Sequence, residues 1–108
     1  MNISLNYLRH KNFAIYGLGV TGRSVINYFN KYGFKNYVGW DDDKQTFKKF
    51  LGSKYKRMRS DFLKLINFVD YIIVSPGINI NKAKLKKILL KNKHKIITDL
   101  DLFYLINP

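Results

Sequence analysis

The sequence predicts an α/β domain of the Rossmann-like, three-layer class, with a five-stranded parallel sheet in the order 3-2-1-4-5. Short apolar runs alternate with amphipathic segments along the chain, which is typical of a parallel sheet covered by helices on both faces. Residues 17–22 read G-x-G-x-x-G between an apolar run and an amphipathic segment, the strand–turn–helix context that this motif requires. Right-handed crossovers and a reversal of strand order after the glycine turn then give the predicted order.

Length and composition indicate one globular domain over residues 1–108. The chain has 108 residues, of which 46% are hydrophobic, and no cysteine, so disulfides and thiolate metal sites are excluded. The N-terminal stretch is interrupted by polar residues and does not resemble a secretory signal. No apolar run approaches the ~20 residues needed to cross a bilayer. We therefore expect a soluble cytoplasmic domain with no membrane partner.

The net charge of +13, from 20 basic and seven acidic residues, has two interpretations. It favours an anionic partner such as nucleic acid, or it reflects a composition rich in Lys, Asn, Ile, Phe and Tyr. The lysines are spread along the chain, which favours the second interpretation and no specific nucleic-acid partner. His10 and His94 lie in basic, polar surroundings and are expected on the surface.

The first half of the chain supplies two strands and one long helix. Residues 1–11 are expected to form a short leader with at most an irregular turn. Residues 12–16 are an apolar run without alternation, as expected for a strand covered on both faces. Residues 20–32 carry one apolar stripe at helical spacing, and Gly33 follows where a left-handed C-terminal residue is favoured. Residues 37–40 form the second strand.

The second half predicts three more strands. The strongest of them is 71–74, an apolar run that Ser75-Pro76-Gly77 ends abruptly. The other predicted elements, in order, are a short helix at 46–51, a weak basic strand at 54–59, a brief helix capped by Ser60 and Asp61, a helix from 81 with Leu85, Ile88 and Leu89 inward, a strand at 95–98, and a final turn for which Asp99 is the N-cap.

The glycine turn is the first candidate site. It offers the backbone N–H groups of Gly19, Val20 and Thr21, together with the Thr21 hydroxyl, at the start of a helix. Such an arrangement favours a phosphate or another anion. The alternative is that the glycines serve only tight packing of helix against strand.

Two further groups are expected at the same edge of the sheet, where ligands of such folds bind. Asp41 ends the second strand about 20 residues after the glycines, where an acidic residue reaches a ribose or base edge. Ser75-Pro76-Gly77 ends the strand next to the first one and faces the glycine turn, unless it is turn chemistry alone. Asp42 and Asp43 are expected to form a solvated turn. Together these groups favour a nucleotide with its phosphates on the glycine turn.

Four motifs in combination resemble the N-terminal domain of the Mur ligases, and most closely the branch that adds D-glutamate during peptidoglycan synthesis. They are residues 16–22 (YGLGVTG), 40–42 (WDD), 74–78 (VSPGI) and 98–103 (TDLDLF). The resemblance covers essentially the whole chain. Asp42 and Asp43 depart from the family, which often has a hydroxyl, amide or basic residue there, and Thr98 stands where glycine is common.

The resemblance implies that the domain holds the UDP end of UDP-N-acetylmuramoyl-L-alanine. By matching position, Gly19, Val20 and Thr21 would cradle the diphosphate, Gly77 would close its phosphate side, and Asp41 would hydrogen-bond the uracil. The supporting loop residues would be Gly17, Gly22, Ser75 and Pro76.

The resemblance also implies an ATP-dependent ligase that joins an acid to an amino acid. In this family ATP and Mg²⁺ phosphorylate the substrate carboxylate, and the D-glutamate amine captures the acyl phosphate. The P-loop pattern G-x-x-x-x-G-K-[ST] is missing from this sequence, so the central ATP-binding and C-terminal domains are expected to be absent. We therefore expect a monomer that binds substrate without catalytic residues, metal or cofactor of its own, in a pathway serving cell-wall biogenesis, cell shape and cell division.

A different function stays open on the residues alone. The glycine motif and Asp41 suit the NAD(P)-binding domain of a dehydrogenase or regulatory sensor equally well, because the acid could bind an adenosine ribose diol. No residue after the fourth predicted strand supplies a nicotinamide partner.

Overall fold

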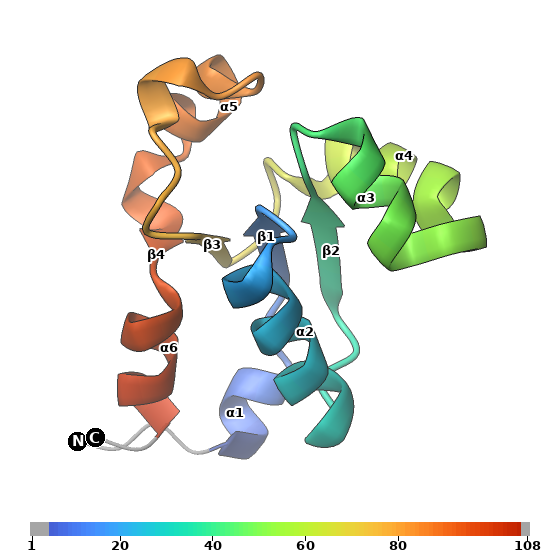
Figure 1. The fold of residues 1–108 in the computed structure, drawn as a ribbon. Coiled ribbons are helices and arrows are strands. Elements are labelled where there is room, and N and C mark those ends of the chain that lie inside the picture. Colours follow the sequence, from blue (N-terminus) through green and yellow to red (C-terminus); the bar gives the residue numbers. More distant parts are fainter. Residues whose placement is uncertain (1–4, 107–108) are drawn as a thin grey trace.

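The computed structural model describes residues 5–106 and contains one parallel sheet in the order β2-β1-β3-β4. The strands are β1 (Phe13–Tyr16), β2 (Tyr37–Trp40), β3 (Tyr71–Val74) and β4 (Ile96–Ile97). The helices are α1 (Leu5–Arg9), α2 (Val20–Lys31), α3 (Lys44–Leu51), α4 (Tyr55–Leu65), α5 (Lys86–Lys91) and α6 (Asp99–Ile106), with 3₁₀ turns η1 (Gly52–Lys54), η2 (Ile80–Lys82) and η3 (Lys93–Lys95). Figure 1 shows α3 and α4 beside β2, and α5 and α6 on the β4 side.

Helices pack against both faces of the central strand β1. All four of its residues are buried, and successive side chains of a strand point to opposite faces. The Phe13 ring lies 4.8 Å from Phe29 of α2, centroid to centroid, whereas Tyr16 lies 6.2 Å from Phe62 of α4. This confirms the α/β class and the three-layer arrangement.

The sheet has four strands, so the predicted five-stranded order 3-2-1-4-5 is wrong. The expected strand at 54–59 is helical and belongs to η1 and α4. Tyr55, Phe62 and Ile66 are buried on one side of this segment, and Met58 packs against the core. Those positions recur at the three- and four-residue spacing of a helix. Because Ser60 lies inside α4, it does not cap a separate helix.

Three other elements differ from expectation. Of the expected leader, residues 1–4 lie outside the described part, but residues 5–9 form α1, and Leu8 is fully buried. The final helix is capped by Thr98 instead of Asp99. Thr98 Oγ1 accepts the Asp101 N–H at 3.1 Å, and Asp101 Oδ2 accepts the Thr98 N–H at 2.9 Å, which is a reciprocal capping box. The helix expected from residue 81 is the short turn η2 followed by α5.

The pairing register of β1 with β2 and β3 determines where the candidate site lies. Tyr16 at the end of β1 is paired with Trp40 of β2 on one side and Val74 of β3 on the other. Three strands therefore end at one level, and the loops that follow them leave the sheet together. Gly33 adopts a left-handed φ of 78° just after α2, as predicted, and turns the chain back toward β2.

Candidate functional site

The loops after β1, β2 and β3 enclose a cavity of about 380 Å³. Seven of the nine residues predicted for the site line it: Gly17, Gly19, Val20, Thr21, Asp41, Ser75 and Gly77. Tyr16, Asp42 and Ile78 complete the lining. Gly22 is buried behind the loop, and Pro76 lies in the exposed turn after β3. The loops predicted for the site therefore meet at one cavity in the structure.

Two glycines of the motif are required by the fold. Gly17 has a φ of 106°, and a Cβ there would lie 2.6 Å from Ile78 Cδ1 and 3.1 Å from Ser75 Oγ. A Cβ at Gly22 would lie 1.8 Å from the Gly17 carbonyl oxygen. Both positions therefore exclude any larger residue, and they let α2 begin directly against the end of β1.

Gly19 is different, because nothing in the described part of the chain requires a glycine there. Its φ of −73° suits any residue, and no atom lies within 4 Å of a Cβ built at this position. The same open space surrounds Gly77 across the cavity. The walls formed by these two residues are therefore bare backbone, which allows a ligand to approach closely.

The N-terminus of α2 is left without a cap. Gly19 occupies the N-cap position, no side chain accepts a hydrogen bond from the first turn, and that turn holds no acidic residue. The first N–H groups of a helix have no intrahelical acceptor. Val20 and Thr21 line the cavity, so their N–H donors and the positive end of the helix dipole favour an anion there.

Asp41 fixes the glycine loop to the end of β2. Its Oδ2 accepts the Leu18 N–H at 2.7 Å, and its Oδ1 accepts the Asp43 N–H at 2.8 Å. A carboxylate oxygen has room for a second hydrogen bond. Asp41 is half-buried and lines the cavity, so the side chain can hold the loop and still accept from a ligand.

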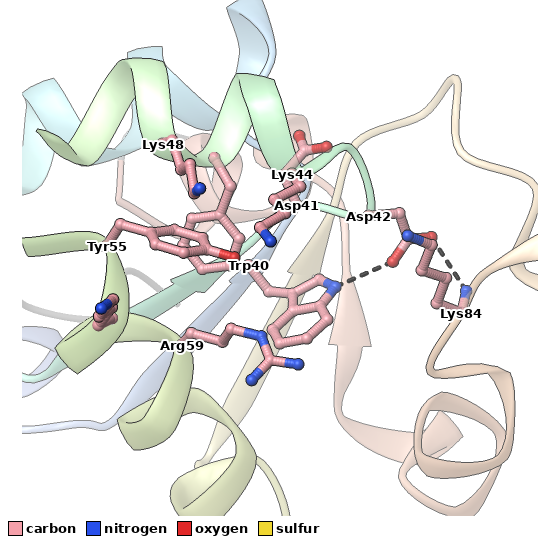
Figure 2. A pocket seen from close by; sticks show the side chains of 10 residues that line it. Trp40, Asp41, Asp42, Lys44, Lys48, Tyr55, Arg59 and Lys84 are labelled. Atoms are coloured by element: carbon pink, nitrogen blue, oxygen red, sulfur yellow. Dashed lines mark hydrogen bonds between the residues drawn. The ribbon is translucent and has the colours of Figure 1, made fainter.

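Asp42 is half-buried and makes a connection that sequence reasoning missed, because its carboxylate is held by protein donors and is not simply solvated as expected. Its Oδ1 accepts hydrogen bonds from the Tyr16 hydroxyl and from Trp40 Nε1, the latter at 2.9 Å. Its Oδ2 accepts the Lys84 N–H at 3.0 Å. Figure 2 shows the links to Trp40 and Lys84. Asp42 therefore ties the ends of β1 and β2 to the segment that leads into α5.

The Tyr16 hydroxyl extends this connection by accepting the Leu85 N–H at 3.2 Å. Burial raises the pKa of Tyr16 well above its usual range, and the hydrogen bond to Asp42 raises it further. The phenol is therefore neutral and serves as a fixed donor. The sequence did offer one sign of this role for Asp42. Tyr16 and Trp40 end two predicted strands, and a buried tyrosine hydroxyl or tryptophan N–H needs a hydrogen-bond partner.

Asp43 is also structural and not merely part of a turn. It caps α3 by accepting the Gln45 N–H at 3.1 Å and the Thr46 hydroxyl at 2.8 Å. The Thr46 hydrogen bond is the main cause that lowers the Asp43 pKa. Each of the three consecutive aspartates thus has its own role in the local structure.

Charge around the cavity comes from carboxylates alone. Among the residues that the structure describes, Asp41 and Asp42 line it and no lysine or arginine does. His10 and His94 are exposed, as predicted. Within residues 5–106, no group of three or more histidine or acidic side chains is placed to hold a metal ion. The same part of the chain contains no helix long and apolar enough to cross a bilayer.

Comparison with known proteins gives a consistent result. The family model for the Mur ligase MurD-like N-terminal domain matches residues 11–98, a range that includes all four strands and the loops of the cavity. Three enzymes named UDP-N-acetylmuramoylalanine--D-glutamate ligase are similar over 94% of the chain: 30% identical in Wolbachia pipientis wMel, 32% in the Wolbachia of Brugia malayi, and 35% in Buchnera aphidicola from Schizaphis graminum.

The chain spans about a fifth of the length of these relatives, 20% to 23%. No solved structure gives a significant match. The match covers most of the chain and includes the glycine turn, the residues after β2 and the turn after β3. The chain therefore belongs to the MurD-like N-terminal domains of the Mur ligase family.

Proposed function

We propose that this domain binds the UDP portion of UDP-N-acetylmuramoyl-L-alanine for a cytoplasmic peptidoglycan ligase that adds D-glutamate. The single observation that carries the proposal is the uncapped N-terminus of α2, which lines the same cavity as Asp41 and Gly77. Membership of the family and the name shared by the relatives support the same ligand.

The diphosphate lies on the glycine turn in this proposal. Gly19, Val20 and Thr21 supply backbone N–H donors, and the Thr21 hydroxyl adds one more. Gly77 approaches from the opposite wall, where the absence of a Cβ leaves room for phosphate oxygens. Because no cation lines the cavity, the backbone donors and the helix dipole are the groups of this domain that stabilise the negative charge.

Asp41 recognises the uracil in this proposal. The uracil ring carries one N–H at N3, which a carboxylate can accept. Asp41 is already oriented by the Leu18 and Asp43 N–H groups at 2.7 and 2.8 Å. A preorientated acceptor loses little side-chain freedom when the ligand binds. The same hydrogen bonds connect uracil recognition to the position of the glycine loop.

The domain binds but does not catalyse on its own. In the complete ligase, ATP with Mg²⁺ would supply a phosphoryl group to the substrate carboxylate, and D-glutamate would displace it. The sequence contains no P-loop pattern, which supports assigning ATP binding to another part of the complete ligase. The role of this chain is to hold and orient the nucleotide end of the substrate as a monomer.

Calorimetric titration of the 108-residue chain with UDP-N-acetylmuramoyl-L-alanine and, separately, with NAD tests the proposal. We expect binding of the uridine nucleotide, and Asp41→Ala should weaken it by roughly 1.5–3 kcal/mol, the value of a hydrogen bond to a charged group. Asp61→Ala, which removes an exposed carboxylate on α4, is the matched control and should bind normally. Binding of NAD without binding of the uridine nucleotide would contradict the proposal.

A further inference from the structure

A second cavity, of about 540 Å³, shares Asp41 and Asp42 with the first and is otherwise lined mainly by residues of α3 and α4 (Figure 2). Half of its ten lining residues are cationic, although only 20 of the 108 residues in the chain are lysine or arginine. These cations are Lys44, Lys48, Lys56, Arg59 and Lys84. Basic residues are spread along the sequence, but five of them come together around this cavity.

Asp41 and Asp42 line the same cavity, so five cations and two carboxylates give it a formal charge of +3. Asp41 accepts two backbone N–H groups, and Asp42 accepts from Tyr16, Trp40 and the Lys84 backbone. Within residues 5–106, the salt bridge that the structure contains joins Arg57 to Asp61, and neither lines the cavity. Within the described residues, none of the five cations forms a salt bridge, although Lys84 interacts electrostatically with Asp43 at longer range.

Buried aromatic rings position two of the cations. Trp40 packs edge-on against Phe47 at 5.6 Å, and Phe47 packs against Tyr55 at 4.8 Å with the rings perpendicular. The Lys48 ammonium lies 5.5 Å from the Tyr55 ring centre, and the Arg59 guanidinium lies 5.5 Å from the centre of the Trp40 ring. Cation–π contacts of this kind order long side chains, so this charge is partly preorganised.

We propose that this cavity binds a small, multiply charged phosphate anion of the oligophosphate class, at a site separate from the glycine turn. Guanidinium groups bind phosphate oxygens in pairs, and ammonium groups add compact charges around them. The cavity has the volume of an ordinary small-ligand site. The glycine-turn cavity, in contrast, is lined by no cation and relies on backbone donors.

The observations favour a small ligand over a nucleic-acid strand. Proteins that bind single strands present aromatic faces on which bases stack. Trp40 and Tyr55 are only 6% and 8% exposed, and each has a cation over its ring. The rings here support the cations and offer no free face for a base.

The test is titration of the chain with sodium tripolyphosphate at about 0.15 M ionic strength, where charges beyond about 8 Å are screened. Trp40 is the single tryptophan of the sequence and lines the cavity, so its fluorescence reports binding locally. We expect saturable binding, a change in Trp40 emission, and about tenfold weaker binding in Lys48→Gln/Arg59→Gln, because charged hydrogen bonds are lost.

Two further variants control for folding and for net charge. Lys44→Gln/Lys56→Gln removes two cavity cations for which the structure shows no ring contact, and should also bind about tenfold more weakly. Lys31→Gln/Lys91→Gln removes the same charge elsewhere, including one lysine over a tyrosine ring, and should bind within about twofold of the original chain. Equal weakening in all three pairs would overturn the proposal, because attraction would then be diffuse.

Competition experiments separate this site from the other two possibilities. Saturation with UDP-N-acetylmuramoyl-L-alanine should leave tripolyphosphate binding in place. Loss of tripolyphosphate binding in Gly19→Ala, with retention in both cavity variants, would place the anion on the glycine turn and overturn the proposal. A single-stranded oligonucleotide that binds more tightly than tripolyphosphate and depends on the same cations would overturn the small-ligand assignment.

Discussion

Replacing Asp42 by alanine tests whether one carboxylate holds the carboxyl edge of the sheet together. The side chain accepts hydrogen bonds from the Tyr16 hydroxyl, from Trp40 Nε1 and from the Lys84 N–H. Tyr16 and Trp40 are 1% and 6% exposed, so in the variant their donors have little access to water. The Lys84 amide lies in an exposed segment and can be solvated at little cost.

The expected loss in the free energy of unfolding of Asp42→Ala follows from these three hydrogen-bond donors. A hydrogen bond to a charged acceptor is worth about 1.5–3 kcal/mol, and a buried donor left unsatisfied carries the full penalty. Taking the low value for each of the two buried donors and a few tenths for the solvated amide gives a loss of about 3–4 kcal/mol in the free energy of unfolding. For a domain of 108 residues that corresponds to a fall of roughly 13–18 °C in melting temperature.

Urea denaturation followed by circular dichroism and Trp40 fluorescence measures the loss, with Asp61→Ala as the control. Asp61 pairs with Arg57 at 3.8 Å on an exposed surface of α4, so that variant should lose less than about 0.5 kcal/mol. Hydrogen exchange adds a local readout, because the Lys84 and Leu85 amides should lose protection in Asp42→Ala. Equal stability of the two variants, with those amides still protected, would refute the reasoning.

Three other predictions follow from the glycines, the final helix and Tyr16. Gly22→Ala should lower the free energy of unfolding by about 3 kcal/mol or more, because its Cβ would meet the Gly17 carbonyl at 1.8 Å; Gly19→Ala should change it by under about 1 kcal/mol but weaken UDP-ligand binding in calorimetry. Thr98→Ala removes the acceptor of a capping box and should cost about 1 kcal/mol in urea denaturation; an unchanged midpoint would contradict the cap. Burial raises the pKa of the Tyr16 phenol in the folded protein. The stability that the neutral phenol contributes is therefore complete below about pH 10, the pKa of a tyrosine in the unfolded chain, and is lost as the pH rises above it. The free energy of unfolding should accordingly fall less steeply above about pH 10 in Tyr16→Phe, which urea denaturation at several pH values measures.

The elements that could be predicted from the sequence are those fixed by neighbouring residues. β1 and β3 are uninterrupted apolar runs because both of their faces are covered. The glycine turn carries its own conformational requirement at Gly17, and Gly33 ends α2 with a left-handed φ. The loops of the candidate cavity follow directly from these elements, which is why seven of the nine expected residues line it.

The missed features depend on residues far apart in the chain. Asp42 receives hydrogen bonds from Tyr16, 26 positions before it, and from Lys84, 42 positions after it, so its role is invisible in the local pattern D-D-D. The segment at 54–59 is too short to show helical spacing by itself. Its helix becomes apparent only when Tyr55 is read together with Phe62 and Ile66, which share its buried side.

The N-terminus of α2 has no side-chain cap, and the stability of the domain alone gives no reason for leaving it uncapped. A serine or aspartate at the Gly19 position would cap the helix and satisfy a backbone donor, a change worth a few tenths of a kcal/mol relative to glycine. The space for such a side chain exists, since no atom lies within 4 Å of a Cβ there. The same chain caps α3 with Asp43 and α6 with Thr98. The starts of α4 and α5 also lack a side-chain cap. Among the helices within residues 5–106, however, α2 is the one whose first turn lines the candidate cavity, so its exposed donors suit the proposed diphosphate site.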